Sequence, residues 1–338
     1  MIIVLKPDTS KKDEAAVLRE IKKLGYKPHV MRGVERVVIG AIGDERTHQN
    51  LETLTTWPQV EKVMPVQKRY KLTSREAHKG NSTITLPNGT VIGGKKMVVM
   101  AGPCSVESET QLLTTAEAVA KAGATVLRGG AFKPRTSPYE FQGLGEKGLK
   151  LLAKARKQTG LAVITELLSE QQAEMVAEYA DILQIGARNS QNFQLLIAAA
   201  KTGKPVLLKR GLSMKIEEWL LAGEYVLANN NANLMFCERG IRTFETYTRN
   251  TLDLSTIPII KKESHCPIVI DPSQGAGRAD LVMNMCKGAV AMGADSLLIE
   301  VHPNPAEAWS DGAQQLTLDG FAKLMEELKP FIAAAGRE

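Results

Sequence analysis

Eight short apolar runs in the second part of the chain constrain its fold more than any other feature. They are residues 97–102, 125–130, 162–166, 182–186, 205–211, 234–240, 267–271 and 296–301. Each run has the length of one buried strand, and the stretches between them mostly have helical patterning. This repetition predicts an α/β fold, a (β/α)8 TIM barrel. A doubly wound open sheet is the alternative, but no GxGxxG follows the first run.

The first 70 residues have a different rhythm and predict a separate small domain. Apolar runs at residues 2–6, 27–33, 35–43 and 60–66 predict strands, and residues 10–25 and a stretch near 47–56 predict helices. Ser10 is a candidate N-cap and Gly25 a candidate end of the first helix. The order βαββαβ is that of a ferredoxin-like domain. Because the segment has no cluster of catalytic residue types, it is either a stabilising or oligomerising module or an allosteric effector domain.

We therefore divide the chain into three parts. Residues 1–70 form the ferredoxin-like domain, residues 71–96 a linker and a β-hairpin, and residues 97–338 the barrel. The hairpin is predicted from Asn88-Gly89, which stands between two short alternating runs.

Composition limits the classes of ligand. The formal charge is +6 and aromatic residues make up 5% of the 338 residues, so no basic tract with stacking side chains points to nucleic acid. No run is long enough for a signal peptide or a membrane span, and we expect a cytoplasmic protein. The four cysteines form no CxxC pair, which indicates free thiols. The modest positive charge and the low aromatic content favour small anionic ligands.

Charged side chains follow most of the predicted strands. In a barrel of this class the loops after the strands carry the active site, so these side chains are expected to share one mouth. Six of them are basic, which favours a site for more than one anion, either two phosphates or a phosphate and a carboxylate. In chain order the polar residues after the strands are Cys104, Arg128, Lys133, Arg135, Glu166, Arg188, Lys209, Glu238, Arg239, Asp271, Gln274, Glu300, His302 and Asp311.

A second group among these residues has the chemistry of metal ligands. Cys104, Glu300 and Asp311, with His302 near Glu300, combine thiolate, carboxylate and imidazole. Such a set suits a borderline transition metal such as Mn, Fe, Co, Zn or Cu. The alternative for Cys104 is a small buried thiol without a ligand role.

Several long motifs resemble those of 3-deoxy-D-arabino-heptulosonate 7-phosphate (DAHP) synthases, in the subfamily with an N-terminal ferredoxin-like regulatory domain. They are AGPCSVES, LRGGAFKPRTSPYEFQGLGEKG, QIGARN, LLKRG, CERGIRTFE, DPS and EVHPNPAEAWSDG. The resemblance covers essentially the whole chain. It implies a transferase that condenses phosphoenolpyruvate with D-erythrose 4-phosphate, releasing phosphate, in the first step of the shikimate pathway. It also implies feedback inhibition by tyrosine or phenylalanine, bound between ferredoxin-like domains of neighbouring subunits, and a homotetramer.

The resemblance assigns roles residue by residue. Phosphoenolpyruvate would be bound by Arg128, Lys133, Arg188, Lys209 and Arg239, with the backbone near Ala187. The sugar phosphate would be bound in the stretch of Pro134, Arg135, Thr136 and Ser137. Lys133 would also be a proton donor, Glu166 would position the attacking water, and Asp271 would orient the aldose. A divalent metal such as Mn, Fe, Co or Zn would be held by Cys104, Glu300 and Asp311.

Residues 273–278, SQGAGR, are predicted as the loop that leaves the run 267–271. Within them, Gln274 departs from the family pattern, which has histidine after Asp-Pro-Ser. Its amide oxygen can reach a metal, but it binds softer ions less well than imidazole does and carries no proton near neutral pH. Three outcomes follow: a metal held with Gln274 or water as fourth ligand at lower affinity, an altered aldose phosphate or metal, or a binding protein without turnover. His302 is a conceivable substitute ligand. We predict metal-dependent activity with weakened metal affinity.

Overall fold

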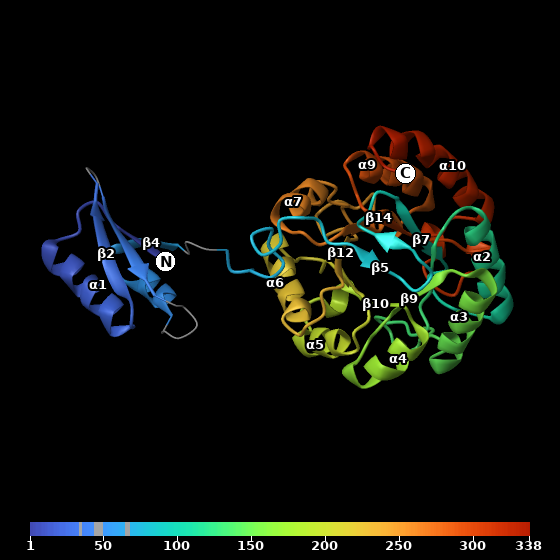
Figure 1. Cartoon of the computed structure of the whole chain (residues 1–338), viewed down its shortest axis with the longest axis horizontal. Helices are drawn as coiled ribbons and strands as arrows, with labels where there is room; N and C mark the ends of the chain where they lie inside the picture. The colour runs from blue at the N-terminus through green and yellow to red at the C-terminus, as the bar shows by residue number, and fades with distance from the viewer. Residues whose placement is uncertain (34–35, 44–49, 65–67) are drawn as a thin grey trace. The chain divides into compact units, whose positions relative to one another are not determined.

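The computed structural model describes residues 1–33, 36–43, 50–64 and 68–338 of the chain. Two compact units, Met1–Arg69 and Tyr70–Glu338, are described separately (Figure 1). Within the described residues, no helix combines the length and the apolar character needed to cross a membrane.

The first unit is a four-stranded antiparallel sheet with the ferredoxin-like strand order β2-β3-β1-β4. Its strands are β1 (Ile2–Leu5), β2 (Lys27–Arg32), β3 (Val37–Ile42) and β4 (Val60–Met64). Helix α1 (Lys11–Lys23) begins as predicted, because the Ser10 hydroxyl accepts a hydrogen bond from the Asp13 N–H at 3.1 Å. The helix predicted near 47–56 is a 3₁₀ helix, η1 (Leu51–Thr56), where it is described, and residues 44–49 lie outside the described residues.

The second unit contains the predicted closed barrel of eight parallel strands, ordered β7-β8-β9-β10-β11-β12-β13-β14. All eight apolar runs form strands. They are β7 (Val98–Gly102), β8 (Val126–Arg128), β9 (Ala162–Glu166), β10 (Ile182–Ile185), β11 (Val206–Lys209), β12 (Leu234–Glu238), β13 (Ile268–Ile270) and β14 (Ser296–Glu300). The prediction of a TIM barrel is therefore confirmed.

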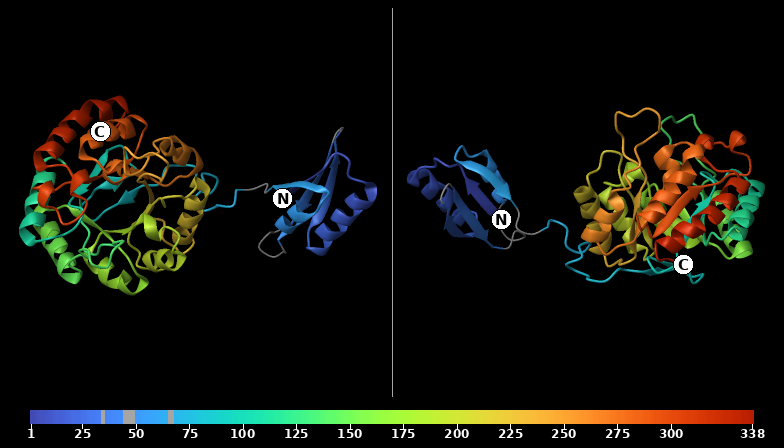
Figure 2. Two further views of the ribbon diagram at one scale, coloured as in Figure 1. Left: turned by 180° about the vertical axis from the view of Figure 1, so that it is seen from behind. Right: turned by 90° about the horizontal axis from the view of Figure 1, so that it is seen from above.

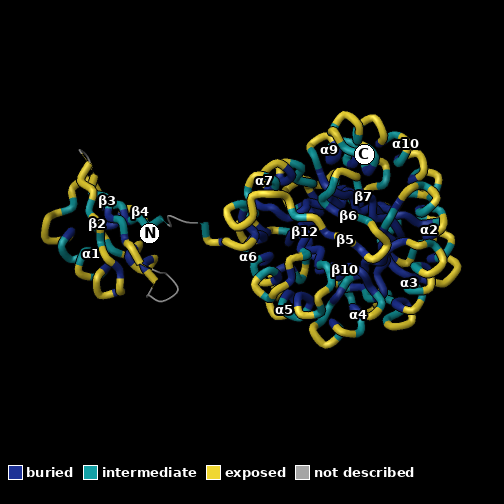
Figure 3. The backbone as a smooth tube through the Cα atoms, in the orientation of Figure 1, coloured by how far each residue is buried: buried dark blue, intermediate teal, exposed yellow. Residues whose placement is uncertain are grey.

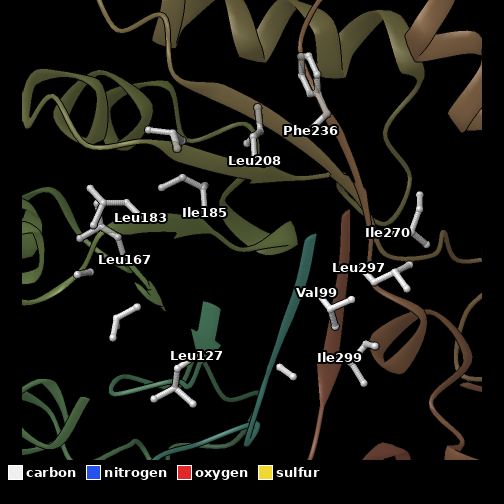
Figure 4. Close-up of a cluster of buried hydrophobic side chains, with 14 of the residues drawn as sticks. Val99, Leu127, Leu167, Leu183, Ile185, Leu208, Phe236, Ile270, Leu297 and Ile299 are labelled. Atoms are coloured by element: carbon white, nitrogen blue, oxygen red, sulfur yellow. The ribbon is translucent and has the colours of Figure 1, made fainter. Parts of the chain in front are cut away.

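Helices surround this barrel and cover its outer side (Figures 1 and 3). They are α2 (Glu109–Lys121), α3 (Glu146–Thr159), α4 (Ala173–Tyr179), α5 (Phe193–Lys201), α6 (Ile216–Leu227), α7 (Thr256–Glu263), α9 (Ala279–Ala291) and α10 (Leu318–Ala334). Outward-facing strand residues such as Leu127, Leu208 and Ile299 are fully buried against them (Figure 4). Strand neighbours alternate between this layer and the barrel interior, so both faces of the strands are apolar, as parallel sheets require.

A hairpin closes one end of the barrel. Strands β5 (Ile84–Thr85) and β6 (Val91–Ile92) pair on either side of Asn88-Gly89, where Gly89 has a φ of +83°. Ile84 and Ile92 pack with interior strand residues, and the Asn88 amide donates to backbone carbonyls that precede β8 and β9. The closed end is thus the amino-terminal end of the strands, opposite to the long loops (Figure 2).

The stretch after β13 corrects one expectation. Residues 273–278 are predicted as a loop, but Pro272–Ala276 form a short helix, α8. The Asp271 carboxylate accepts from the Gln274 N–H at 2.9 Å and caps its start, and Gly277, at a φ of +69°, ends it. This helix fixes the backbone position of Gln274.

Candidate active site

A polar cavity of about 230 Å³ lies at the carboxyl ends of the barrel strands. The six basic residues predicted to share one mouth all line it: Arg128, Lys133, Arg135, Arg188, Lys209 and Arg239. Arg249, from the loop after β12, adds a seventh cation among the described residues. Glu140, Glu166 and Asp311 also line the cavity, so cations exceed anions there by four.

Of the other predicted substrate residues, some line the cavity and some do not. Pro134, Thr136 and Ala187 line the cavity, as does Gln274. Ser137 and Asp271 are not among the lining residues. Asp271 is buried, and its Oδ2 lies 2.6 Å from Nζ of Lys209, which does line the cavity. The carboxylate is thus connected to the cavity by this ion pair.

Arg239 is a buried cation without an anionic partner among the described residues. Its guanidinium donates to the Gln274 side-chain oxygen at 2.9 Å and to the Gly240 carbonyl at 3.4 Å, both neutral acceptors. Burial lowers its pKa, although arginine stays protonated in proteins. A buried guanidinium without a carboxylate partner among the described residues is costly, and its chemistry suits a phosphate or carboxylate ligand.

Arg128 and Lys133 are buried and contact the residues of the possible metal cluster. Arg128 Nη1 donates to Glu300 Oε1 at 2.8 Å, and its Nε has no partner among the described residues. Burial lowers the pKa of Arg128, but the neighbouring negative groups, of which Glu300 contributes most, together outweigh burial and raise that pKa. Lys133 Nζ lies 3.1 Å from both the carbonyl oxygen and the Sγ of Cys104. Burial and the nearby Arg128 lower the pKa of Lys133, but Cys104, Glu166 and Glu300 together outweigh them, so that this pKa is raised.

Cys104, Glu300 and Asp311 come together as a possible metal centre. One ligand atom from each lies within 4.8 Å of the others. Cys104 and Glu300 are buried, and burial followed by the Glu300 charge raises the pKa of the Cys104 thiol to about 11. Asp311 accepts from Arg249 at 3.1 Å, and its pKa is lowered chiefly by that arginine, against the effect of burial. One sulfur and two carboxylate oxygens at this spacing fit a divalent cation with three protein ligands.

The fourth position holds the Gln274 amide, with its nitrogen toward the cluster. Nε2 donates to Glu300 Oε1 at 3.1 Å and to Asp311 Oδ2 at 3.4 Å, while Oε1 accepts from Arg239. His302 does not substitute for the missing imidazole. Its Nε2 lies 3.2 Å from Glu107 Oε2, and it is not part of the three-residue cluster.

Glu166 reaches the cavity because a glycine directly follows the neighbouring strand β10. A Cβ atom at Gly186 would overlap the Glu166 carboxylate, so any larger residue would displace it. A carboxylate held beside several cations is suited to orienting a water molecule or accepting a proton.

Comparison with protein-family models gives two matches that together span almost the whole chain. Residues 74–334 match the DAHP synthetase I family, and residues 1–68 match the DAHP synthase ferredoxin-like domain. The chain belongs to the DAHP synthase family.

Individual relatives agree with this DAHP synthase assignment. The chain is 50% identical to the phospho-2-dehydro-3-deoxyheptonate aldolase of Thermotoga maritima, over 99% of both sequences. The crystal structure of the T. maritima DAHP synthase matches with a TM-score of 0.95 at 49% identity, covering 100% of this chain and 98% of that one. The 2-dehydro-3-deoxyphosphooctonate aldolase of Syntrophotalea carbinolica is 32% identical, over 73% of this chain and 94% of its own.

Two site residues of this DAHP synthase were missed by sequence reasoning. Arg249 lies in the segment between β12 and α7, and the Gln314 amide donates to Glu300 Oε2 at 2.7 Å from η5 (Gly312–Gln314). Neither follows an apolar run directly, so the positional signal that found the other cations is absent. Gln314 lies three residues beyond Asp311, which is the one indication available in the sequence.

Proposed function

We propose that this DAHP synthase family member joins phosphoenolpyruvate to D-erythrose 4-phosphate, forming DAHP and inorganic phosphate. The observation that carries the proposal is a cavity that seven cations and three carboxylates line and that adjoins the Cys104, Glu300 and Asp311 cluster. The two substrates bring two phosphates and a carboxylate, which such a cavity would neutralise.

We assign the deeper cations to phosphoenolpyruvate and the outer ones to the aldose phosphate. Arg239 supports the first assignment because it is buried with no counter-ion in the described part of the chain, and a guanidinium fork matches a phosphate or carboxylate. Arg128, Lys133, Arg188 and Lys209 would complete that subsite, with the backbone at Ala187. Pro134, Arg135, Thr136 and Ser137 lie along one loop after β8 and would hold the aldose phosphate.

The reaction forms a carbon–carbon bond between C3 of phosphoenolpyruvate and the aldehyde carbon, adds water at C2 and releases phosphate. The aldehyde oxygen becomes a hydroxyl and needs a proton, which we assign to Lys133 Nζ. Glu166 would hold the water at C2. Asp271 would orient the aldose, and its carboxylate, 2.6 Å from Lys209 Nζ, would also position that lysine for phosphoenolpyruvate. Cys104, Glu300 and Asp311 would hold a divalent metal, which, when bound, supplies Lewis-acid polarisation of the aldehyde.

A phosphate-release assay tests this proposal with the full-length protein. Phosphate release is expected only with both substrates present, in equal amount to the seven-carbon product identified by mass spectrometry. Mn(II) added after chelation should restore lost activity, and Lys133→Met should lower kcat by roughly 10²–10⁴-fold. Release without the aldose, or a clear preference for a five-carbon aldose phosphate, would overturn it. Absence of turnover in both the wild type and Gln274→His would instead indicate a binding protein.

We propose, in addition, that Met1–Arg69 is a regulatory unit that binds tyrosine or phenylalanine in a homotetramer. The support is the match of residues 1–68 to the DAHP synthase ferredoxin-like domain. The unit also has its own apolar core, which includes Ile3, Val17 and Ile39.

A further inference from the structure

The Gln274 amide stands between two groups that fix its orientation. Arg239 has only donors to offer, and the carboxylates of Glu300 and Asp311 have only acceptors. The amide oxygen therefore faces the guanidinium at 2.9 Å, and the NH₂ group faces the two carboxylates at 3.1 and 3.4 Å. In the reversed orientation, the NH₂ group would face the guanidinium, which is also a donor, and the amide oxygen would face the two carboxylates, which are also acceptors.

The backbone of Gln274 is held independently of its side chain. Its N–H donates to Asp271 at 2.9 Å, and its carbonyl accepts from the Asn250 amide, also at 2.9 Å. Reorientation of the side-chain amide is thus possible without movement of α8. The oxygen, which is the amide atom able to bind a cation, can turn toward the cluster only by leaving Arg239.

Arg239 would release that oxygen when an anion binds. A hydrogen bond between a guanidinium and a phosphate or carboxylate is stronger than one to a neutral amide. Arg239 has no carboxylate partner among the described residues, and both it and Gln274 line the cavity. An anion in the cavity would therefore compete directly with the amide oxygen for this guanidinium.

We infer that Gln274 couples the two halves of the site: phosphoenolpyruvate on Arg239 frees the Gln274 oxygen for a divalent cation at Cys104, Glu300 and Asp311, so that anion and cation bind with positive cooperativity. The inference rests on the proposed function in one respect, which is that Arg239 binds phosphoenolpyruvate. By linkage, each ligand raises the affinity for the other by the same factor, within the usual range of about 5–150-fold.

A histidine at position 274 would uncouple the two ligands. A neutral imidazole offers a ring nitrogen to a cation without first giving up a bond to Arg239. Gln274→His should therefore bind Mn(II) at least roughly tenfold more tightly in the absence of phosphoenolpyruvate. The further gain on adding phosphoenolpyruvate should fall below about twofold.

The test is a pair of binding titrations on the full chain after removal of metal by chelation. Free Mn(II) is followed by electron paramagnetic resonance with and without saturating phosphoenolpyruvate, and a protein-free titration corrects for Mn(II) bound by phosphoenolpyruvate itself. Calorimetry measures phosphoenolpyruvate binding with and without Mn(II). We expect roughly tenfold tighter binding of each ligand in the presence of the other.

Gln314→Met is the matched control. It also removes an amide donor from Glu300, at 2.7 Å, but Gln314 contacts Arg249 and not Arg239. Coupling should persist in this variant and disappear in Gln274→His.

Two results would overturn the inference while leaving the proposed function intact. One is phosphoenolpyruvate that binds but leaves the Mn(II) affinity unchanged, and the other is full coupling in Gln274→His. If phosphoenolpyruvate fails to bind with or without Mn(II), the proposed function fails together with the inference.

Discussion

The buried cations of the cavity differ in their partners, and the partner decides whether a cation stabilises the fold. Lys209 is neutralised by Asp271 at 2.6 Å, and Arg128 by Glu300 at 2.8 Å. Arg239 has neutral partners instead, although 6% of its surface is exposed, nearly as little as for Lys209 at 4%. Lys209 therefore stabilises the fold by satisfying a buried carboxylate. Arg239, a buried cation with no carboxylate partner among the described residues, instead lowers the stability of the fold.

This difference predicts unequal losses of stability for two substitutions of the same kind. Lys209→Met leaves Asp271 buried and unpaired, and we expect the free energy of unfolding to fall by about 3–5 kcal/mol. Arg239→Met removes a buried charge and leaves two neutral acceptors, the Gln274 amide oxygen and the Gly240 carbonyl, without this donor, so the change should stay within about 1 kcal/mol. Urea unfolding followed by circular dichroism measures both. Equal losses in the two variants would show that Arg239 has a stabilising partner after all.

Residue positions alone sufficed to predict which cations share the cavity, but not how they are paired. Arg188 and Lys209 could be placed because each lies near the end of an apolar run, and a barrel brings all strand ends together. The direction of the Gln274 amide depends on Arg239, 35 positions earlier in the chain. Contacts of this kind arise from the closed barrel and leave no pattern in the local sequence.

At the scale of elements, the short helix α8 connects the barrel framework to the site. Asp271 caps it and also holds Lys209, and its last turn lies against Arg249 of the loop after β12. The strands were predictable because eight apolar runs repeat. This helix was not, because five residues with an internal glycine and a proline have the composition of a turn.

The end of α8 supplies a second prediction. Gly277 and Gly160 both end helices in the left-handed conformation, with φ of +69° and +74°. A Cβ at Gly160 would meet no atom within 4 Å, whereas a Cβ at Gly277 would overlap the side chain of Arg249. Gly160→Ala should therefore cost about 1–2 kcal/mol of stability for the conformation alone, without affecting turnover.

Gly277→Ala should cost more and should also lower activity, since Arg249 donates to Asp311 and to Gln314. Thermal unfolding and steady-state kinetics of the two variants give the comparison. Identical stability losses with unchanged kinetics would mean that Arg249 moves aside without consequence for the site.

At the scale of the whole molecule, the buried apolar residues that the structure describes form separate cores in the two units. The core of Met1–Arg69 is drawn entirely from residues up to Val63, and the two barrel clusters are drawn entirely from Tyr70 onward. Each unit buries its own apolar surface, which is what independent folding requires. The start of the second unit is also fixed locally, because the Glu224 carboxylate accepts from the backbone N–H groups of Lys71, Leu72 and Thr73.

A chain that begins at Tyr70 is accordingly expected to fold and to condense the two substrates, because every residue assigned to the cavity and the metal cluster lies beyond residue 100. Loss of the first unit should abolish inhibition by tyrosine or phenylalanine and leave kcat within about twofold. The informative comparison is the inhibition curve of the full-length and shortened proteins, each at equal activity, with circular dichroism to establish folding. Inhibition that persists in the shortened protein would move the effector site into the barrel. Loss of turnover in a folded barrel would assign Met1–Arg69 a part in catalysis itself.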